Sequence, residues 1–89
     1  MRGKGFKTAM TLAFVFVNCM FDQAASVEKA VKDVRGVLEA HTTTGIYDLI
    51  LKVQAEDESK FQELIRKVKG VSGVASTLTS ITYGNASRQ

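Results

Sequence analysis

A short pattern, Val-x-Gly-Val, occurs twice in this chain and limits what it can fold into. The first copy covers residues 34–37 and the second covers residues 71–74. Each copy ends a stretch with helical spacing and opens a stretch with strand spacing. Glycine tolerates the left-handed backbone that ends many helices, so each copy predicts a hinge from helix to strand. We therefore expect one strand-helix-strand unit repeated twice, in the order β-α-β-β-α-β.

The composition fits one small domain without a disulfide framework. The chain has 89 residues, of which 45% are hydrophobic, and its one cysteine is Cys19. A core of this size is marginal by itself. No Cys-x-x-Cys motif and no cluster of cysteine and histidine offers a metal or redox centre. We expect a cytoplasmic protein that uses no metal and no cofactor.

The net charge of +3 comes from the N-terminus rather than from the body of the chain. Arg2, Lys4 and Lys7 precede the first predicted strand, and without them basic and acidic residues are equal in number. A neutral body needs no phosphate-binding face. We predict a disordered basic arm over residues 1–10, one domain over residues 11–84 and a tail over residues 85–89.

The basic arm and the apolar run after it also resemble a secretory signal with a cleavage site near residues 24–26. Cleavage there would delete the first strand of the first repeat, so we favour a buried strand over residues 12–19. That run is too short to span a membrane, because Asn18 and Asp22 interrupt it. Translation can start at Met1 or at Met10, and a start at Met10 removes the arm and leaves the fold untouched.

Four segments have the spacing of strands, at residues 12–19, 37–43, 47–54 and 75–83, with a turn at Thr44-Gly45. The first segment is unusual because both of its faces are apolar. Its two alternating sets are Leu12, Phe14 and Phe16, and Ala13, Val15 and Val17. Such a strand is expected to be covered on both sides.

Two segments have the spacing of helices. The first covers residues 23–35, with Asp22 as its N-cap and one apolar stripe formed by Val27, Ala30, Val31 and Val34. The second ends at Gly70, and acidic residues at its start and basic residues at its end match the helix dipole. Its apolar stripe is formed by Phe61, Leu64, Ile65 and Val68.

These elements predict an α+β fold of the ferredoxin-like type, a four-stranded antiparallel sheet with both helices on one face. The other face is left bare, although the strand at residues 12–19 is apolar on that side too. We expect a second copy of the chain to cover it, giving a homodimer through the sheets.

The stretch Thr44-Gly45-Ile46-Tyr47-Asp48 between the two hinges, together with residues 71–79, resembles the effector-binding domain of the Lrp/AsnC transcription regulators. The resemblance covers residues 12–83. It implies dimers that assemble further, commonly into octamers, and a free amino acid bound between dimers. Full-length regulators of this family carry a helix-turn-helix domain, for which the residues before the first strand leave no room. The resemblance thus predicts a stand-alone sensing module that binds no DNA directly and assembles with full-length regulators.

The same resemblance implies a ligand site. Asp48 would bind the ammonium group of the amino acid, Gly45 would permit its close approach, and Tyr47 would line the side-chain pocket. Thr77 and Thr79 of a neighbouring subunit would supply hydroxyl contacts. Each residue also has a structural alternative: Gly45 as a turn glycine, Asp48 as a partner of that turn, Tyr47 in interface packing and both threonines as ordinary strand residues.

Two other classes of protein share this topology. A small dimeric α+β barrel enzyme, such as a monooxygenase, would use His41 in a pocket between sheet and helices, but no motif gives His41 a partner for proton transfer. We therefore interpret His41 as a surface or interface residue, assign no catalytic residue and expect no enzyme. Cys19 is interpreted as a small buried apolar residue. An RNA-recognition motif needs aromatic and basic residues that the strand at residues 47–54 lacks.

Overall fold

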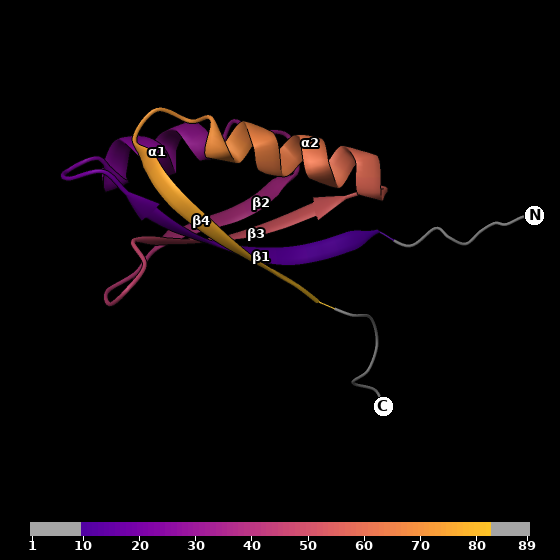
Figure 1. The fold of residues 1–89 in the computed structure, drawn as a ribbon, viewed down its shortest axis with the longest axis horizontal. Helices are drawn as coiled ribbons and strands as arrows, with labels where there is room; N and C mark the ends of the chain where they lie inside the picture. The colour runs from indigo at the N-terminus through magenta and orange to yellow at the C-terminus, as the bar shows by residue number, and fades with distance from the viewer. Residues whose placement is uncertain (1–9, 83–89) are drawn as a thin grey trace, which may run out of the picture.

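The computed structural model describes residues 10–82 and gives six elements in the predicted order (Figure 1). They are β1 (Thr11–Cys19), α1 (Ala24–Val31), β2 (Val37–Thr42), β3 (Leu49–Ala55), α2 (Glu58–Lys69) and β4 (Val74–Ile81). The predicted arm, apart from Met10, and the tail at residues 85–89 lie outside the described residues, as does the last residue predicted for the final strand.

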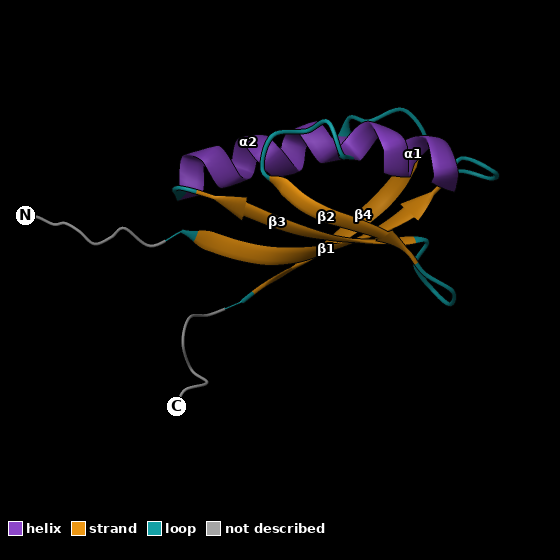
Figure 2. Ribbon diagram, turned by 180° about the vertical axis from the view of Figure 1, so that it is seen from behind, coloured by secondary structure: helices purple, strands orange, loops and turns teal. Residues whose placement is uncertain are grey.

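The strands form one antiparallel sheet in the order β2-β3-β1-β4. Both helices lie on the same side of this sheet, and no other element of residues 10–82 covers the opposite side, which we call the bare face (Figure 2). This is the predicted ferredoxin-like arrangement. The apolar strand β1 lies in the interior of the sheet, between β3 and β4.

The core lies between the sheet and the helices. Alternate residues of β1 and β3 that face the helices are completely buried, namely Ala13, Val15, Val17, Leu49, Leu51 and Val53. The helices contribute the predicted stripes, of which Val27, Val31, Phe61, Leu64 and Val68 are buried. No polar or charged residue of the described chain is buried with them. The helix-facing side is therefore an ordinary apolar core.

The first helix differs from its prediction at both ends. Asp22 was predicted as the N-cap, and this is wrong, because the helix begins at Ala24 and its N-cap is Gln23, which makes no side-chain cap bond. Asp22 instead has a left-handed backbone with φ of 62° and forms part of the turn before the helix. The helix also ends at Val31 rather than at residue 35, because the amides of Asp33 and Val34 bond carbonyls three residues back, which tightens the chain into turns.

The second helix and the third strand are closer to expectation. Asp57 is the N-cap of α2, and its carboxylate accepts a hydrogen bond of 2.8 Å from the amide of Lys60. Strand β3 begins at Leu49, two residues later than predicted, because the preceding residues belong to the turn. In that turn the amide of Thr43 donates to the carbonyl of Asp48 at 2.9 Å.

The two Val-x-Gly-Val copies have the same conformation. Gly36 and Gly73 have φ of 102° and 101°, and each hinge closes with a 3.1 Å hydrogen bond from the amide of its last valine to the carbonyl of its first. This is the pattern of a type II turn, whose third residue needs a positive φ. Each hinge also packs on the helix of the other repeat: a Cβ on Gly36 would lie 3.0 Å from Leu64, and one on Gly73 would lie 2.8 Å from Val27.

Candidate functional site

The predicted site residues at 45–48 lie in the hairpin between β2 and β3, at the end of the molecule where β1 also ends (Figure 1). Gly45 is exposed, has φ of 117°, and no described atom beyond its two chain neighbours lies within 4 Å of where its Cβ would be. The glycine is thus required by the backbone, and the space beside it is open. The hydroxyl of Thr43 donates to the carbonyl of Tyr47 and holds the hairpin closed.

Asp48 joins the hairpin to the neighbouring strand. Its Oδ2 accepts a hydrogen bond of 2.7 Å from the amide of Cys19, and its own amide donates to the carbonyl of Val17 at 2.9 Å. The predicted structural alternative for Asp48 was a bond within its own turn, whereas its carboxylate in fact bonds the end of β1. Oδ1 accepts no hydrogen bond from residues 10–82. The half-buried carboxylate is therefore fixed in place with one oxygen available.

The burial of Cys19 and the nearby carboxylate of Asp48 together change the pKa of the Cys19 thiol. Cys19 was predicted as a small buried apolar residue, and it packs against the core but is only half-buried. Burial raises the pKa of its thiol above the ordinary value, and the neighbouring charge of Asp48 raises it further. The thiol is therefore kept in its neutral form, which is a poor nucleophile.

Tyr47 lies on the bare face of the sheet. Its ring packs on that of Phe16 with centroids 5.4 Å apart and planes tilted by 44°. Tilted aromatic pairs at this separation are stabilising. Tyr47 consequently contributes to the apolar surface of the bare face and is half-buried next to Asp48 in the chain. Its predicted alternative role in interface packing stays a prediction.

Thr77 and Thr79 belong to the edge strand β4, on the side of the helices. They pair with Val17 and Val15, whose side chains are fully buried against the helices. Thr77 lines a groove of about 330 Å³ together with Lys69 and residues 74–76, whereas Thr79 does not. Lys69 was not among the predicted site residues, because its position in the last turn of a helix indicated only a match to the helix dipole.

Within one chain these residues do not form a single site. Strand β1 lies between β4 and β3, and Tyr47 and Thr77 are on opposite faces of the sheet. This geometry is compatible with the expectation that the threonines act on the hairpin of a different subunit. The role of all five residues in ligand binding stays a prediction.

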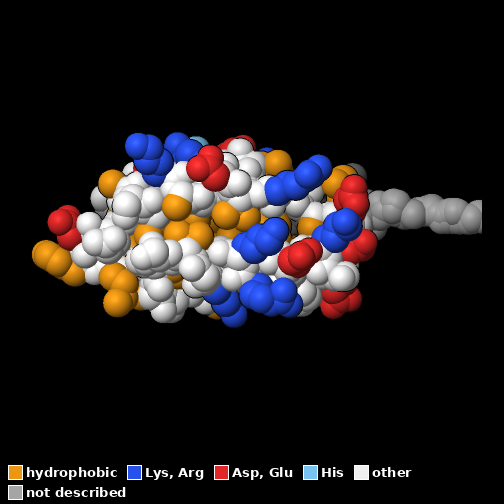
Figure 3. Space-filling view, turned by 90° about the horizontal axis from the view of Figure 1, so that it is seen from above, with side chains coloured by type: hydrophobic (Ala, Val, Ile, Leu, Met, Phe, Trp, Pro, Cys, Tyr) orange, Lys and Arg blue, Asp and Glu red, His pale blue; other side chains and the backbone are white. Residues whose placement is uncertain are grey.

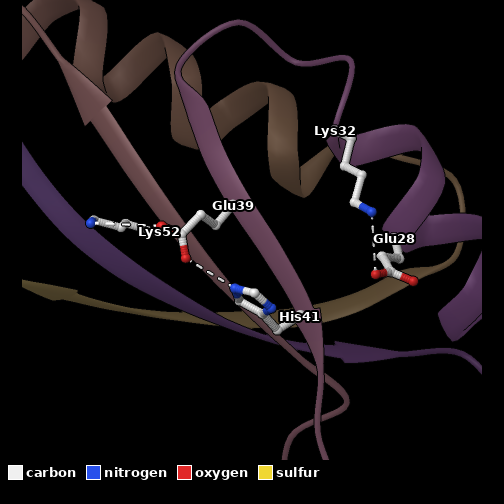
Figure 4. Close-up of polar contacts among 5 residues, drawn as sticks. All are labelled: Glu28, Lys32, Glu39, His41 and Lys52. Atoms are coloured by element: carbon white, nitrogen blue, oxygen red, sulfur yellow. Dashed lines mark hydrogen bonds and ion pairs between the residues drawn. The ribbon is translucent and has the colours of Figure 1, made fainter.

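His41 lies on the bare face, away from the helices (Figure 4). Its Nε2 is 3.0 Å from Oε1 of Glu39, whose Oε2 is 3.8 Å from the ammonium of Lys52. The hydrogen bond from His41 and the charge of Lys52 lower the pKa of Glu39. The side chain of His41 is 65% exposed. It therefore lies on the opposite side of the sheet from the pocket that the enzyme alternative requires.

Two further properties concern the described residues as a set. They contain no group of three histidine, cysteine, aspartate or glutamate side chains arranged to hold a metal ion. Neither of the helices between residues 10 and 82 has the length and apolar character needed to cross a membrane.

Solved structures of transcription regulators share this fold. AsnC of E. coli superposes with a TM-score of 0.77 at 23% identity, over 93% of this chain and 61% of that one. The transcriptional regulator NMB0573 of Neisseria meningitidis, solved as a complex with L-Met, superposes with a TM-score of 0.71 at 22% identity, over 82% of this chain and 49% of that one. At these identities the likeness establishes the ferredoxin-like α+β fold.

The sequence establishes the family. Residues 12–88 match the Lrp/AsnC ligand binding domain, so the chain belongs to that family. A homocitrate synthase of Sulfolobus acidocaldarius is 34% identical over 71 residues, which are 79% of this chain and 15% of that enzyme. Because the chain spans so little of the enzyme, its likeness concerns one segment and not the synthase activity. The predicted family is therefore confirmed, and the chain is a regulatory effector-binding module.

Proposed function

We propose that this protein is an amino-acid sensing module, without enzymatic activity or direct DNA binding, that acts in the cytoplasm through changes in its assembly. The observation that carries the proposal is the hairpin at residues 43–48. It holds a half-buried carboxylate in a fixed position beside an open glycine turn. A family defined by ligand binding and a neighbour solved with L-Met support this assignment.

The chemistry of the hairpin matches one half of a free amino acid. An ammonium group needs an acceptor, and Oδ1 of Asp48 is available while Oδ2 is held by Cys19. The open space beside Gly45 admits the ligand to the backbone, and Tyr47 offers an apolar wall for its side chain. The hairpin thus supplies the anionic and apolar contacts that an amino acid requires.

The other half is supplied by a neighbouring subunit. The carboxylate of the ligand needs donors, and the groove beside β4 offers the hydroxyl of Thr77 and the ammonium of Lys69. Thr79 lies next along the same side of the strand. Because the two halves are on opposite faces of one sheet, the complete site forms only between subunits.

The first level of assembly is a homodimer through the bare sheet faces. That face carries large apolar side chains, which are Leu12, Phe14, Phe16, Ile50 and Leu78. Leu78, for example, is 53% exposed. Such a surface is costly in water, and a second sheet covers it without changing either chain. Dimers then combine into larger rings, of which the octamer is the expected form.

Ligand binding acts by shifting this assembly. A ligand that contacts two subunits binds the assembled state better than the separate one, and it can move the equilibrium only by that difference. Mixed assembly with full-length regulators of the same family would transmit the shift to transcription. The module itself needs no DNA-binding surface for this role.

Isothermal titration calorimetry against each of the twenty amino acids tests the proposal. We expect at least one amino acid to bind, and Asp48→Asn to weaken that binding by about tenfold or more, since a hydrogen bond to a charged group is worth about 1.5–3 kcal/mol. Asp33→Asn, which removes an exposed carboxylate elsewhere, is the matched control and should leave binding unchanged. If no amino acid binds, or both variants behave alike, the sensor role is wrong.

A further inference from the structure

The turn after β1 presents an exposed aromatic side chain. This turn lies at one end of the molecule (Figure 1). Phe21 is 95% exposed there, and Met20 is 58% exposed. Hydrophobic side chains protrude at this end in the space-filling view, beside an acidic one (Figure 3). We call residues 20–22 the tip.

The tip is held in a fixed shape. The amide of Met20 donates to the carbonyl of Gly73 at 2.7 Å, and the amide of Gln23 donates to the carbonyl of Met20 at 3.0 Å. Asp22 is exposed and has a left-handed backbone, which costs free energy for a residue other than glycine. Because the backbone of this turn is already ordered, binding through its aromatic side chain costs little further backbone freedom, which favours a role as an anchor.

A groove of about 470 Å³ lies at the opposite end, where β1 and β2 begin and β3 ends. Its apolar lining includes Met10, Leu38 and Leu64. Met10 and Leu38 are themselves 52% and 51% exposed, so residues 10–82 leave this lining open. An aromatic anchor from another molecule would cover it.

The charges of the two ends are complementary. The groove includes three basic side chains, Arg35, Lys60 and Lys67, and two acidic ones, Glu56 and Glu63. The tip has one charge, that of Asp22. A carboxylate entering beside the aromatic ring meets an excess of positive charge, and a guanidinium can bind it with two hydrogen bonds.

We propose that the tip of one copy inserts into the groove of the next copy, with Phe21 against Leu38 and Leu64 and with Asp22 paired to Arg35. The two surfaces are different and lie at opposite ends, so the contact is heterologous and adds subunits head to tail. It leaves the bare sheet face free. The contact therefore joins one sheet-to-sheet dimer to the next, and in this respect it rests on the proposed function.

Substitution of the exposed ring tests the contact by sedimentation velocity. Phe21→Ser should weaken association beyond the dimer by about tenfold or more, because it removes the aromatic side chain that the proposed contact would bury. Phe21→Leu keeps an apolar anchor and should retain the larger species. Phe21 makes no core contact, so both variants should keep the circular dichroism spectrum of the parent chain. A Phe21→Ser variant that assembles like the parent would overturn the proposal.

Reversal of charge tests the pairing. Asp22→Arg and Arg35→Asp should each reduce the larger species, and the two changes combined should restore them. The combination of Asp33→Arg with Arg35→Asp is the matched control and should restore nothing, since Asp33 is exposed but outside the tip. Equal rescue by both combinations would show a general effect of net charge and would exclude this contact.

The same measurements separate this contact from the sheet-to-sheet dimer. A parent chain that stops at the dimer overturns the tip contact and leaves the sheet-to-sheet dimer in place. Loss of assembly with Phe21→Ser but not with Phe16→Ser upholds the tip contact and overturns the dimer through the sheets. A parent chain that stays monomeric at every concentration overturns both.

Discussion

Strand β1 contributes apolar side chains to both faces of the sheet, but the two sets have different surroundings. In β1 the residues that face the helices, Ala13, Val15 and Val17, are fully buried. The residues between them, Leu12, Phe14 and Phe16, are larger and remain half-exposed. One face therefore stabilises the fold of a single chain, while the other has apolar area that residues 10–82 leave in contact with water. Substitutions on the two faces should consequently affect different equilibria.

The largest expected effect is the loss of folding stability caused by a substitution on the helix-facing side of the sheet. Leu51→Ala removes part of a completely buried side chain and should lower the free energy of unfolding by about 2–5 kcal/mol. Urea unfolding monitored by circular dichroism measures it, at a protein concentration where the state of assembly is known. A loss well under 1 kcal/mol would mean that this face is not the main source of stability.

The bare face should respond in assembly rather than in folding. Phe16→Ser removes one aromatic side chain from each partner of a dimer, and at about 1.5 kcal/mol each the dissociation constant should rise by about 100-fold. Sedimentation equilibrium measures this change. Phe21→Ser removes an exposed ring outside the sheet and is the control that should leave the dimer intact. Equal effects of the two variants on the dissociation constant would show that the bare face has no specific role in the dimer.

A smaller effect is expected at the end of β1, where the charge of Asp48 acts on the thiol of Cys19. Asp48→Asn keeps an acceptor for the amide of Cys19 but removes the charge that helps raise the pKa of the thiol. The pKa of Cys19 should then fall, so more thiolate forms at mildly alkaline pH. The rate of alkylation by iodoacetamide across that pH range should rise relative to the parent chain. Asp57→Asn, at a distant helix cap, should not change that rate.

The smallest effect should come from the polar edge of the bare face. The pKa of Glu39 is lowered in the folded chain, so its stabilising effect is complete above the ordinary carboxyl pKa. That effect is lost as the pH falls through the lowered value. The difference in thermal stability between the parent chain and Glu39→Gln should accordingly disappear in acid. Because these side chains are exposed, added salt should also reduce the difference.

Local patterns were sufficient to predict most of the fold. The hinge glycines, the alternation in β1 and the end of α2 at Gly70 each depend on neighbours a few residues away, and all three agree with the structure. Asp22 was misassigned because an acidic residue before an apolar stripe is as compatible with a left-handed turn as with an N-cap.

The site was less accessible to sequence reasoning for a different reason. The bond from Cys19 to Asp48 joins residues far apart in the chain, and the groove beside Thr77 combines a helix end with an edge strand. Neither has a local pattern. The residues at 45–48 were proposed from a family resemblance, whereas Lys69 could be proposed only once the helix and strand were placed together.

The crossed packing of the two hinges has a consequence for how the molecule comes apart. Gly36 rests on Leu64, and Gly73 rests on Val27, so each repeat closes against a helix that the other repeat provides. Neither half can detach and leave its counterpart intact, because the loss of one helix uncovers the hinge of the remaining repeat. The chain should thus lose protection from hydrogen exchange in both halves together, in one cooperative opening.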